Sequence, residues 1–386
     1  MNEGLYILQG EEEKKKGIHY EVDLNRELGA GGMGRVLFGY RVDEKHGTRR
    51  EVAVKFLYGN LDKSEIDRAR REASIQLRND NLVEMFGLVE IRSVDENNQP
   101  IVRQHVVSEY LNGVTLQDLM EGKITDKSGK EIPGMRDFLN EYKRDKEKFA
   151  VKVLKHMLSG IQALHDAGYV HRDIDPGNIM LTSDKRIKLI DFGVVHELDS
   201  SKSNKEGTVV GTFIGKPAYA APEIVLGDVL NHKETTDIYA LGILFFQLLT
   251  GHLPFTGNQQ EVMKNQINDP LPLDEIKDEK LRDIIRQATE KTQENRFQSA
   301  AEFRVALDKY PSLKPIPVPA PKTPPILTPP TLKKQKKKEI SKPTPDKGNI
   351  PVGGKNNGNG EDSYTWWYVA LITFAILAGA AMAFLM

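Results

Sequence analysis

The amino-acid sequence predicts an α+β protein, followed by a long extended linker and one transmembrane helix. Two observations lead to this expectation. A glycine-rich turn near residue 30 lies between two β-rich segments, and a helical pattern follows later in the chain. From residue 311 onward the composition changes to proline and lysine, and the last 23 residues carry no charged side chain. We therefore expect a lead-in at residues 1–19, a folded region at 20–309, a linker at 310–363 and a transmembrane helix at 364–386.

Composition narrows the classes of function. The chain has 386 residues, which is more than one ordinary domain needs. Its net charge is −1, which gives no reason to expect a nucleic-acid partner. It contains no cysteine, which excludes disulfides, thiol catalysis and cysteine-based zinc sites. The lead-in contains the polar run Glu11–Lys16, which we expect to be solvated.

The glycine-rich turn has the pattern of a phosphate-binding loop. Residues 29–36 read Gly-Ala-Gly-Gly-Met-Gly-Arg-Val, which fits G-x-G-x-x-G-x-V. Glycines let a backbone approach phosphates closely and adopt dihedral angles that other residues avoid. A dinucleotide-binding turn is the alternative, but it would open a helix after its last glycine. Residues 36–40 are β-rich instead, so we favour a loop between two strands, at residues 20–28 and 35–40.

A lysine and a glutamate downstream of this loop form a candidate ion pair. Lys55 ends the alternating segment at residues 52–55, and on a strand beneath the loop it would reach the α and β phosphates of a nucleotide. Glu72 lies in a helical stretch at about residues 63–77 and could hold Lys55 in place. Both could instead be solvated surface charges. The other motifs, in the expected order, favour the ion pair.

Residues 171–178 and 191–193 carry the strongest signal in the chain. They read His-Arg-Asp-Ile-Asp-Pro-Gly-Asn and Asp-Phe-Gly, and their order and spacing are specific although each short motif alone is common. Phosphoryl transfer requires positioning, metal ions that bridge the phosphates, and a carboxylate that faces the attacking hydroxyl. We expect Asp173 to accept or orient the hydroxyl proton. Asn178 and Asp191 would bind Mg²⁺, or Mn²⁺ in its place.

Taken together, these motifs resemble those of the eukaryotic-type serine/threonine protein kinases, in a bacterial-like form, over roughly residues 20–309. Ala221-Pro222-Glu223 and the segment 237–242 extend the resemblance. The resemblance implies a two-lobed protein-kinase-like fold. Its β-rich N-lobe, residues 20–108, would hold a five-stranded sheet with one helix, and its helical C-lobe would cover residues 109–309. ATP would bind between the lobes.

The resemblance also implies roles for individual residues. The catalytic set would comprise Asp173, Lys55, Glu72 and Asn178. The hinge at residues 109–111 would meet the adenine of ATP through its backbone. The whole ATP-binding set would be Leu28, Gly29, Gly31, Gly34, Val36, Ala53, Lys55, Glu109, Leu111 and Met180. Structural residues of the C-lobe would be Arg172, Asp237, and the paired Glu223 and Arg296.

Control by phosphorylation is a further implication of the resemblance. In this family the arginine before the catalytic aspartate, here Arg172, clusters with a phosphorylated residue of the activation segment, residues 191–223. Thr208 and Thr212 are the best candidates, because the serines at 200, 201 and 203 lie nearer the Asp-Phe-Gly end. A phosphate brings about two negative charges and strong acceptors, which can order such a segment. Self-association of two chains would allow autophosphorylation.

Two positions depart from the family pattern. Asp175 stands where most members have a lysine that contacts the transferred phosphate. Lys216 stands where most have a threonine that bonds the catalytic aspartate and that lysine. The two changes are either a charge swap that preserves function or the mark of a weakened enzyme. Because the other catalytic residues are all present, we favour an active enzyme.

The C-terminal part predicts a spacer and a membrane anchor. Twelve of the twenty prolines lie between Pro311 and Pro351, which favours an extended, solvated segment; an SH3-like partner is the alternative reading. Residues 366–386 would form a helix about 31 Å long, close to the hydrocarbon thickness of a bilayer. Lysines between residues 333 and 338 precede the span. The positive-inside tendency therefore predicts a cytoplasmic kinase region. Because the one span lies at the end of the sequence, we expect a single-pass protein with no domain on the far side.

Three classes of function remain. The first is a membrane-anchored serine/threonine kinase that transfers the γ-phosphate of ATP to hydroxyl groups of protein substrates. The second is a pseudokinase, an ATP-binding scaffold with weak or no transfer activity. The third is a small-molecule phosphotransferase of kinase-like fold, but that class lacks the Ala-Pro-Glu element and the long activation segment. We favour the first.

Overall fold

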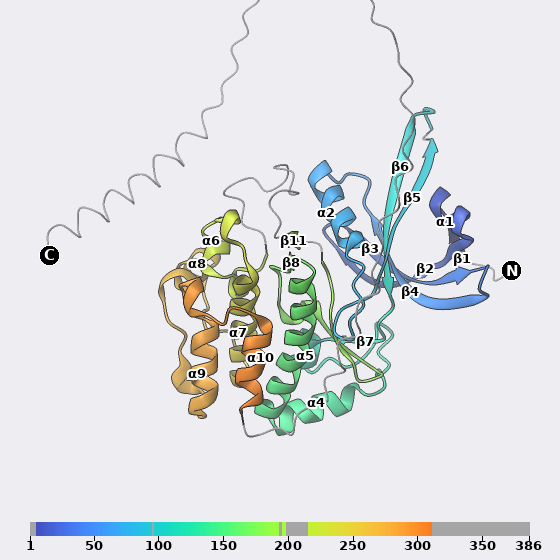
Figure 1. Ribbon diagram of the computed structural model, residues 1–386. Coiled ribbons are helices and arrows are strands. Elements are labelled where there is room, and N and C mark those ends of the chain that lie inside the picture. Colours follow the sequence, from blue (N-terminus) through green and yellow to red (C-terminus); the bar gives the residue numbers. More distant parts are fainter. Residues whose placement is uncertain (1–4, 95, 193–194, 198–214, 311–386) are drawn as a thin grey trace, which may run out of the picture. The chain divides into compact units, whose positions relative to one another are not determined.

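The computed structural model describes residues 5–94, 96–192, 195–197 and 215–310 (Figure 1). The predicted linker, apart from Tyr310, and the predicted transmembrane helix lie outside these residues, as do Gly193, Thr208 and Thr212. Within the described residues, no helix is both long enough and apolar enough to cross a membrane. The membrane anchor therefore stays a prediction.

The N-terminal region is a six-stranded antiparallel sheet in the order β1-β2-β3-β4-β6-β5. Successive residues of a strand face opposite sides of a sheet. In β6, Val106 accordingly joins the large core shared with the helices, whereas Val107 joins a smaller core made of sheet residues. The strands are β1 (Leu5–Leu8), β2 (Ile18–Gly31), β3 (Gly34–Asp43), β4 (Thr48–Leu57), β5 (Met85–Val94) and β6 (Pro100–Glu109).

This sheet has one strand more than the five that the resemblance implies. β1 pairs with β2, with Leu5 opposite Asp23 and Leu8 opposite Tyr20, and Leu8 is fully buried. The apolar run of β1 is short and lies beside a strongly polar stretch, which is why the sequence indicates only a lead-in. That polar stretch is exposed, as expected, but it forms the helix α1 (Glu11–Lys16).

Helix α2 (Lys63–Ser74) packs on the sheet and carries Glu72. Asp62 begins the helix with a capping box: its carboxylate accepts from the Glu65 backbone N–H at 2.9 Å, and the Glu65 carboxylate accepts from the Asp62 backbone N–H at 2.9 Å. The helix ends three residues before the predicted end at residue 77, because Ile75 leaves the helical conformation. Its buried face consists of Ala69, Glu72 and Ala73.

The C-terminal region is mainly helical. Helices α5 and α7 pack against each other, and α9 and α10 flank them (Figure 1). α7 is buried from Thr235 to Phe246, as is typical of a helix inside a large core. A β-rich lobe followed by a helical lobe is the architecture that the resemblance implies. The helices are α3 (Leu116–Met120), α4 (Met135–Arg144), α5 (Lys146–Asp166), α6 (Pro222–Val225), α7 (Glu234–Thr250), α8 (Gln259–Asn268), α9 (Glu279–Ala288) and α10 (Ala300–Asp308).

Short strands position the two acidic motifs. β9 lies between β10 and β7 in a three-stranded sheet, and β8 pairs with β11. The turn after β8 carries residues 171–178, and the turn after β10 carries Asp191. The strands are β7 (Gly113–Thr115), β8 (Tyr169–Val170), β9 (Ile179–Thr182), β10 (Ile187–Leu189) and β11 (His196–Glu197).

Candidate active site

Lys55 and Glu72 form an ion pair. In β4, Val52 and Val54 are fully buried, so Lys55 emerges on the opposite face of the strand. Its Nζ lies 3.0 Å from Glu72 Oε2. Burial lowers the pKa of Lys55, but the carboxylates of Glu72 and Asp191 outweigh burial and raise that pKa, so the lysine stays charged. The structure thus brings together the two residues that the sequence pairs.

Asp237 fixes the turn that carries the catalytic motif. Its fully buried carboxylate accepts hydrogen bonds from the backbone N–H groups of His171 and Arg172, both at 2.8 Å, and contacts the His165 ring at 2.8 Å. Burial raises the pKa of Asp237, but its hydrogen bonds outweigh burial and lower it. Arg172 has a φ of 67°, which is uncommon for a residue with a side chain. The two backbone hydrogen bonds hold this turn and so present Asp173.

Asp173 is the candidate base. Asn178 Nδ2 donates to its carboxylate at 2.9 Å and to its backbone carbonyl at 2.8 Å, which orients the side chain. Burial raises the pKa of Asp173; His171 opposes this change, and the carboxylates of Asp175 and Asp191 add to it. A carboxylate with a raised pKa accepts a proton more readily than an exposed aspartate does.

Asn178 and Asp191 fit a magnesium site. The Asn178 amide nitrogen donates to Asp173, so the amide oxygen is the atom that remains to face a ligand. Asp191 is exposed, and the neighbouring Phe192 is buried with its ring edge-on to His171. Mg²⁺ in such sites binds one or two carboxylates together with substrate phosphates. Among the described residues, no group of three or more His, Cys, Asp or Glu side chains could hold a metal ion by itself.

The apolar residues expected around the adenine are partly exposed. Val52 and Val54 are fully buried, but Ala53 between them is not. Ala53 lies opposite Ser108 of β6, the residue that precedes the hinge. A partly exposed apolar surface beside backbone groups suits a flat heterocycle. The same intermediate exposure is found at Leu28, Val36, Ala53, Leu111 and Met180.

The glycine loop contains two kinds of glycine. A Cβ at Gly34 would lie 2.2 Å from the Phe56 carbonyl oxygen, so the close pairing of β3 with β4 requires glycine there. A Cβ at Gly29 or Gly31 would meet no atom within 4 Å. The packing of the protein itself therefore does not explain why glycine stands at positions 29 and 31. Their open backbone leaves room for a phosphate group.

Comparison with known proteins assigns the chain to a family. The family model described as the protein kinase domain matches residues 22–304. The chain belongs to the protein kinase family. It is 30% identical over 316 residues to the serine/threonine-protein kinase PknB of Mycobacterium tuberculosis (strain ATCC 25618 / H37Rv). It is also 31% identical over 295 residues to the serine/threonine-protein kinase Pkn1 of Myxococcus xanthus.

These similarities concern the kinase domain. The alignments cover 79% of this chain and 44% of the mycobacterial protein, and 74% of this chain and 37% of the myxococcal one. The chain thus spans less than half the length of these curated relatives. Both relatives are bacterial, which agrees with a eukaryotic-type kinase in a bacterial-like form. Kinases of this family use ATP and a divalent metal ion.

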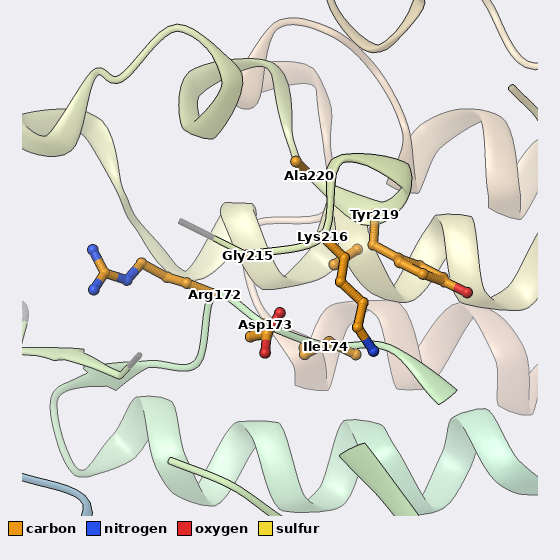
Figure 2. Close-up of a pocket in the computed structure, with 8 residues that line it drawn as sticks. Arg172, Asp173, Ile174, Gly215, Lys216, Tyr219 and Ala220 are labelled. Carbon is orange, nitrogen blue, oxygen red and sulfur yellow. The ribbon is translucent and has the colours of Figure 1, made fainter. Parts of the chain in front are cut away.

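The two residues that depart from the kinase pattern meet in the structure. Lys216 Nζ lies 2.6 Å from Asp175 Oδ1. The Asp175 side chain is 1% exposed, whereas that of Lys216 is 50% exposed. Figure 2 shows Lys216 extending toward the catalytic loop at Ile174, while Arg172 points away on the other side of Asp173. The charge exchange noted in the sequence is therefore an ion pair between the catalytic loop and the activation segment.

Two arginines of α2 lie near enough to Arg172 to affect its pKa. Burial lowers the pKa of Arg172 to about 10; Asp237 opposes this change, and the guanidinium groups of Arg71 and Arg68 add to it. The sequence motifs indicate Arg172 alone. The two arginines of α2 were missed because helical spacing does not show which neighbouring segment each side chain approaches. The predicted phosphorylation sites lie outside the described residues.

Glu109 of the hinge has a buried partner that no sequence motif indicates. The Lys188 ammonium pairs with the Glu109 carboxylate and donates to the Leu82 carbonyl at 2.9 Å. Both charged side chains are buried. The available signal was a lysine within the apolar run at residues 187–190. This pair ties the hinge to β10, the strand that leads to Asp191.

Glu223 and Arg296 form the pair that the resemblance implies. Arg296 donates to the two Glu223 carboxylate oxygens at 2.8 and 3.0 Å. Both residues are buried. The contact joins α6, at the end of the activation segment, to the loop before α10.

Proposed function

We propose that this protein is an active, membrane-anchored serine/threonine kinase that transfers the γ-phosphate of ATP to hydroxyl groups of protein substrates. The observation that carries the proposal is that Lys55 pairs with Glu72 at 3.0 Å and also feels the carboxylate of Asp191, which raises the pKa of the lysine together with Glu72. Protein kinases require the lysine–glutamate pair and the metal-binding aspartate in place together. No nucleic-acid partner enters the proposal.

Each residue has a defined task in this mechanism. Lys55 orients the α and β phosphates. Asn178 and Asp191 would hold Mg²⁺, or Mn²⁺, which would offset the phosphate charge when bound. Asp173 orients the substrate hydroxyl and receives its proton as the hydroxyl oxygen bonds to the γ-phosphorus. The bond from that phosphorus to the bridging oxygen breaks, and ADP leaves.

The direct test is phosphoryl transfer by the full-length chain. Labelled ATP, Mg²⁺ and a generic protein substrate should give phosphoserine or phosphothreonine, and the Asp173→Asn variant should give none. If the wild type binds nucleotide but transfers no phosphate, the protein is a pseudokinase, which is the alternative that the unusual Asp175 suggests. If the label appears on small hydroxyl compounds and not on protein, the protein is a small-molecule phosphotransferase.

We also expect activation by phosphorylation of Thr208 or Thr212. Three guanidinium groups, those of Arg172, Arg68 and Arg71, lie close enough to affect one another electrostatically. A phosphate among them would relieve this repulsion, so together they offer a binding site for an anion. Phosphatase treatment of active full-length protein should lower kcat about tenfold, which corresponds to the loss of one charge-assisted hydrogen bond. Mass spectrometry before and after treatment would locate the phosphate.

The matched variants separate this mechanism from a general charge effect. Arg68→Met with Arg71→Met should remove most of the response to phosphatase, whereas Arg78→Met, an exposed arginine beyond α2, should not. A fully active preparation with both threonines unmodified would exclude this control. Self-association is the proposed route to the modification, so its rate should rise with protein concentration.

Membrane anchoring is the third part of the proposal. Full-length protein should fractionate with membranes and require detergent. Ile376→Arg places a charge near the middle of the span, which costs about 2.5–3.5 kcal/mol in the free energy of membrane insertion. This variant should shift toward the soluble fraction. The control variant Ile376→Leu should stay with the membranes. A glycosylation reporter after Met386 should report the far side, and one before Met1 the cytoplasm. The opposite reporter pattern would overturn the proposed topology.

A further inference from the structure

The ion pair between Asp175 and Lys216 lies within the candidate active site. Asp175 is on the catalytic loop, two residues after Asp173, and Lys216 is on the activation segment. Asp175 Oδ1 and Lys216 Nζ are 2.6 Å apart although 41 residues separate them in the chain. The pair therefore joins the catalytic loop to the segment that ends at Ala-Pro-Glu.

Asp175 is firmly held in the catalytic loop. Its Oδ1 accepts a hydrogen bond from the Gly177 backbone N–H at 2.6 Å, and its Oδ2 accepts one from Asn178 Nδ2 at 3.2 Å. The same Asn178 nitrogen donates to Asp173 Oδ2 at 2.9 Å. One amide group thus links the carboxylate that holds Lys216 to the candidate base. The Lys216 ammonium is consequently held in the surroundings of the reacting hydroxyl.

The backbone that carries Lys216 is also fixed. Gln266 of α8 donates to the Ala218 carbonyl at 2.6 Å and to the Pro217 carbonyl at 3.3 Å. Gly215 has a φ of 108°, and a Cβ there would lie 3.5 Å from Asp173 Oδ1. These contacts hold the start of this segment against the catalytic loop.

Lys216 keeps an accessible side. Its side chain is 50% exposed, and its ammonium has three N–H donors, of which Asp175 can engage one or two. At Gly177, a Cβ would lie 3.1 Å from Lys216 Nζ and 2.9 Å from Asp175 Oδ1, so glycine leaves this side of the pair open. An accessible cation near the candidate base can stabilise the charge that the transferred phosphate carries.

We propose that Lys216 supplies the cation that contacts the transferred phosphate and that Asp175 positions it. This inference rests on the proposed kinase function. Without Lys216, Asp175 would place uncompensated negative charge near that phosphate, which opposes transfer. Because the cation comes from the activation segment, the site is complete only when the segment around Gly215 lies against the catalytic loop.

A purely structural role for Lys216 leads to a different expectation. If Lys216 only neutralises the buried Asp175 carboxylate, removing both charges with Lys216→Met and Asp175→Asn should restore activity. If Lys216 contacts the phosphate, this charge-free variant regains only the part of the loss that the unpaired Asp175 carboxylate causes, and it stays well below the wild type because the cation is still missing. The exchanged variant, Asp175→Lys with Lys216→Thr, restores the usual family pattern and should then recover most of the activity. Such non-additivity is typical of directly coupled residues.

The kinetic test uses the full-length protein with ATP and Mg²⁺. We expect Lys216→Met to lower kcat about 100-fold and to change the KM for ATP less than about threefold, because the contact strengthens in the transition state. Lys216→Arg keeps the charge and should retain more activity than Lys216→Met. Lys264→Met, at an exposed lysine of α8, is the matched control and should behave like wild type. Melting temperatures identify any variant that fails to fold.

Chemical acetylation of lysines provides a readout that does not require turnover. In the wild-type protein, a non-hydrolysable ATP analogue with Mg²⁺ should protect Lys216, and ADP with Mg²⁺ should not, whereas both should protect Lys55. Equal protection of Lys216 by both nucleotides or by neither would overturn this inference and leave the kinase function standing. So would recovery of the full wild-type activity in the charge-free variant. An inactive wild-type chain that still shows the expected protection would overturn the kinase function alone.

Discussion

Asp173→Asn is expected to lower kcat about a thousandfold or more, to the background of the assay, because it removes the group that accepts the hydroxyl proton. Nucleotide affinity should remain close to that of the wild type, since Asn178 and Asp191 are unchanged. Asp191→Ala, in contrast, removes a metal-binding carboxylate and should weaken nucleotide binding as well as transfer. Radiolabel transfer and titration of ATP with Mg²⁺ measure the two effects separately.

A matched aspartate controls for the loss of one charge. Asp166 is exposed at the end of α5, and Asp166→Asn should leave kcat unchanged. Melting curves of both variants show whether the fold is retained. Wild-type turnover in Asp173→Asn would refute the enzymatic mechanism. Among the described carboxylates, only Asp173 and Asp175 accept a hydrogen bond from the Asn178 side chain, and Asp175 is already paired with Lys216.

The raised pKa of Asp173 makes the same variant informative about pH. Activity requires the deprotonated carboxylate, so kcat/KM should fall on the acid side at a higher pH than an exposed aspartate would give. The stability of the fold depends on pH in the opposite direction to activity. A group whose pKa is higher in the folded state than in the unfolded state stabilises the fold at low pH. This contribution is lost as pH rises through the folded pKa. Asp173→Asn should therefore melt above the wild type at neutral pH, and the difference should shrink on acidification.

The residue types of the site could be predicted from the sequence because their chemistry depends on short motifs. Lys55 and Asp173 each stand in a recognisable local pattern, and the family resemblance supplied the pairing of Glu223 with Arg296. Contacts between segments with no shared motif could not be predicted in this way. Lys188, which pairs with Glu109 across 79 residues, is an example. β1 was missed for a different reason, since four apolar residues cannot be distinguished from a chance run until a partner strand is known.

Asp175 and Lys216 fall between these cases. Each was conspicuous only as a departure from the family pattern, and the sequence left open whether the two charges meet. The structure decides the contact, since the charged atoms are 2.6 Å apart, but a contact does not by itself decide between charge neutralisation and phosphate binding. A buried carboxylate needs a partner in either case. That is why the charge-free double variant separates these two roles and a single substitution does not.

Arg296→Met is expected to be the most destabilising substitution considered, by about 3–5 kcal/mol, because it leaves the buried Glu223 carboxylate without its cation. Arg296 also donates to the carbonyl groups of Thr235, Lys291 and Glu290 at 2.7–3.0 Å, and these acceptors would lose their donor too. Urea unfolding of the full-length protein in detergent, followed by circular dichroism, measures the change in the free energy of unfolding.

Two further variants test the cause of this loss. Arg286→Met breaks an exposed pair with Asp283 and should cost less than about 1 kcal/mol, because such pairs contribute little in water. Glu223→Gln added to Arg296→Met removes the buried charge and should recover part of the lost stability, since an amide is less costly to bury than an unpaired carboxylate. If Arg296→Met is no more destabilising than Arg286→Met, the buried pair does not hold the activation segment to the C-lobe, and another contact, such as that of Thr236 Oγ1 with Glu223 at 2.8 Å, must do so.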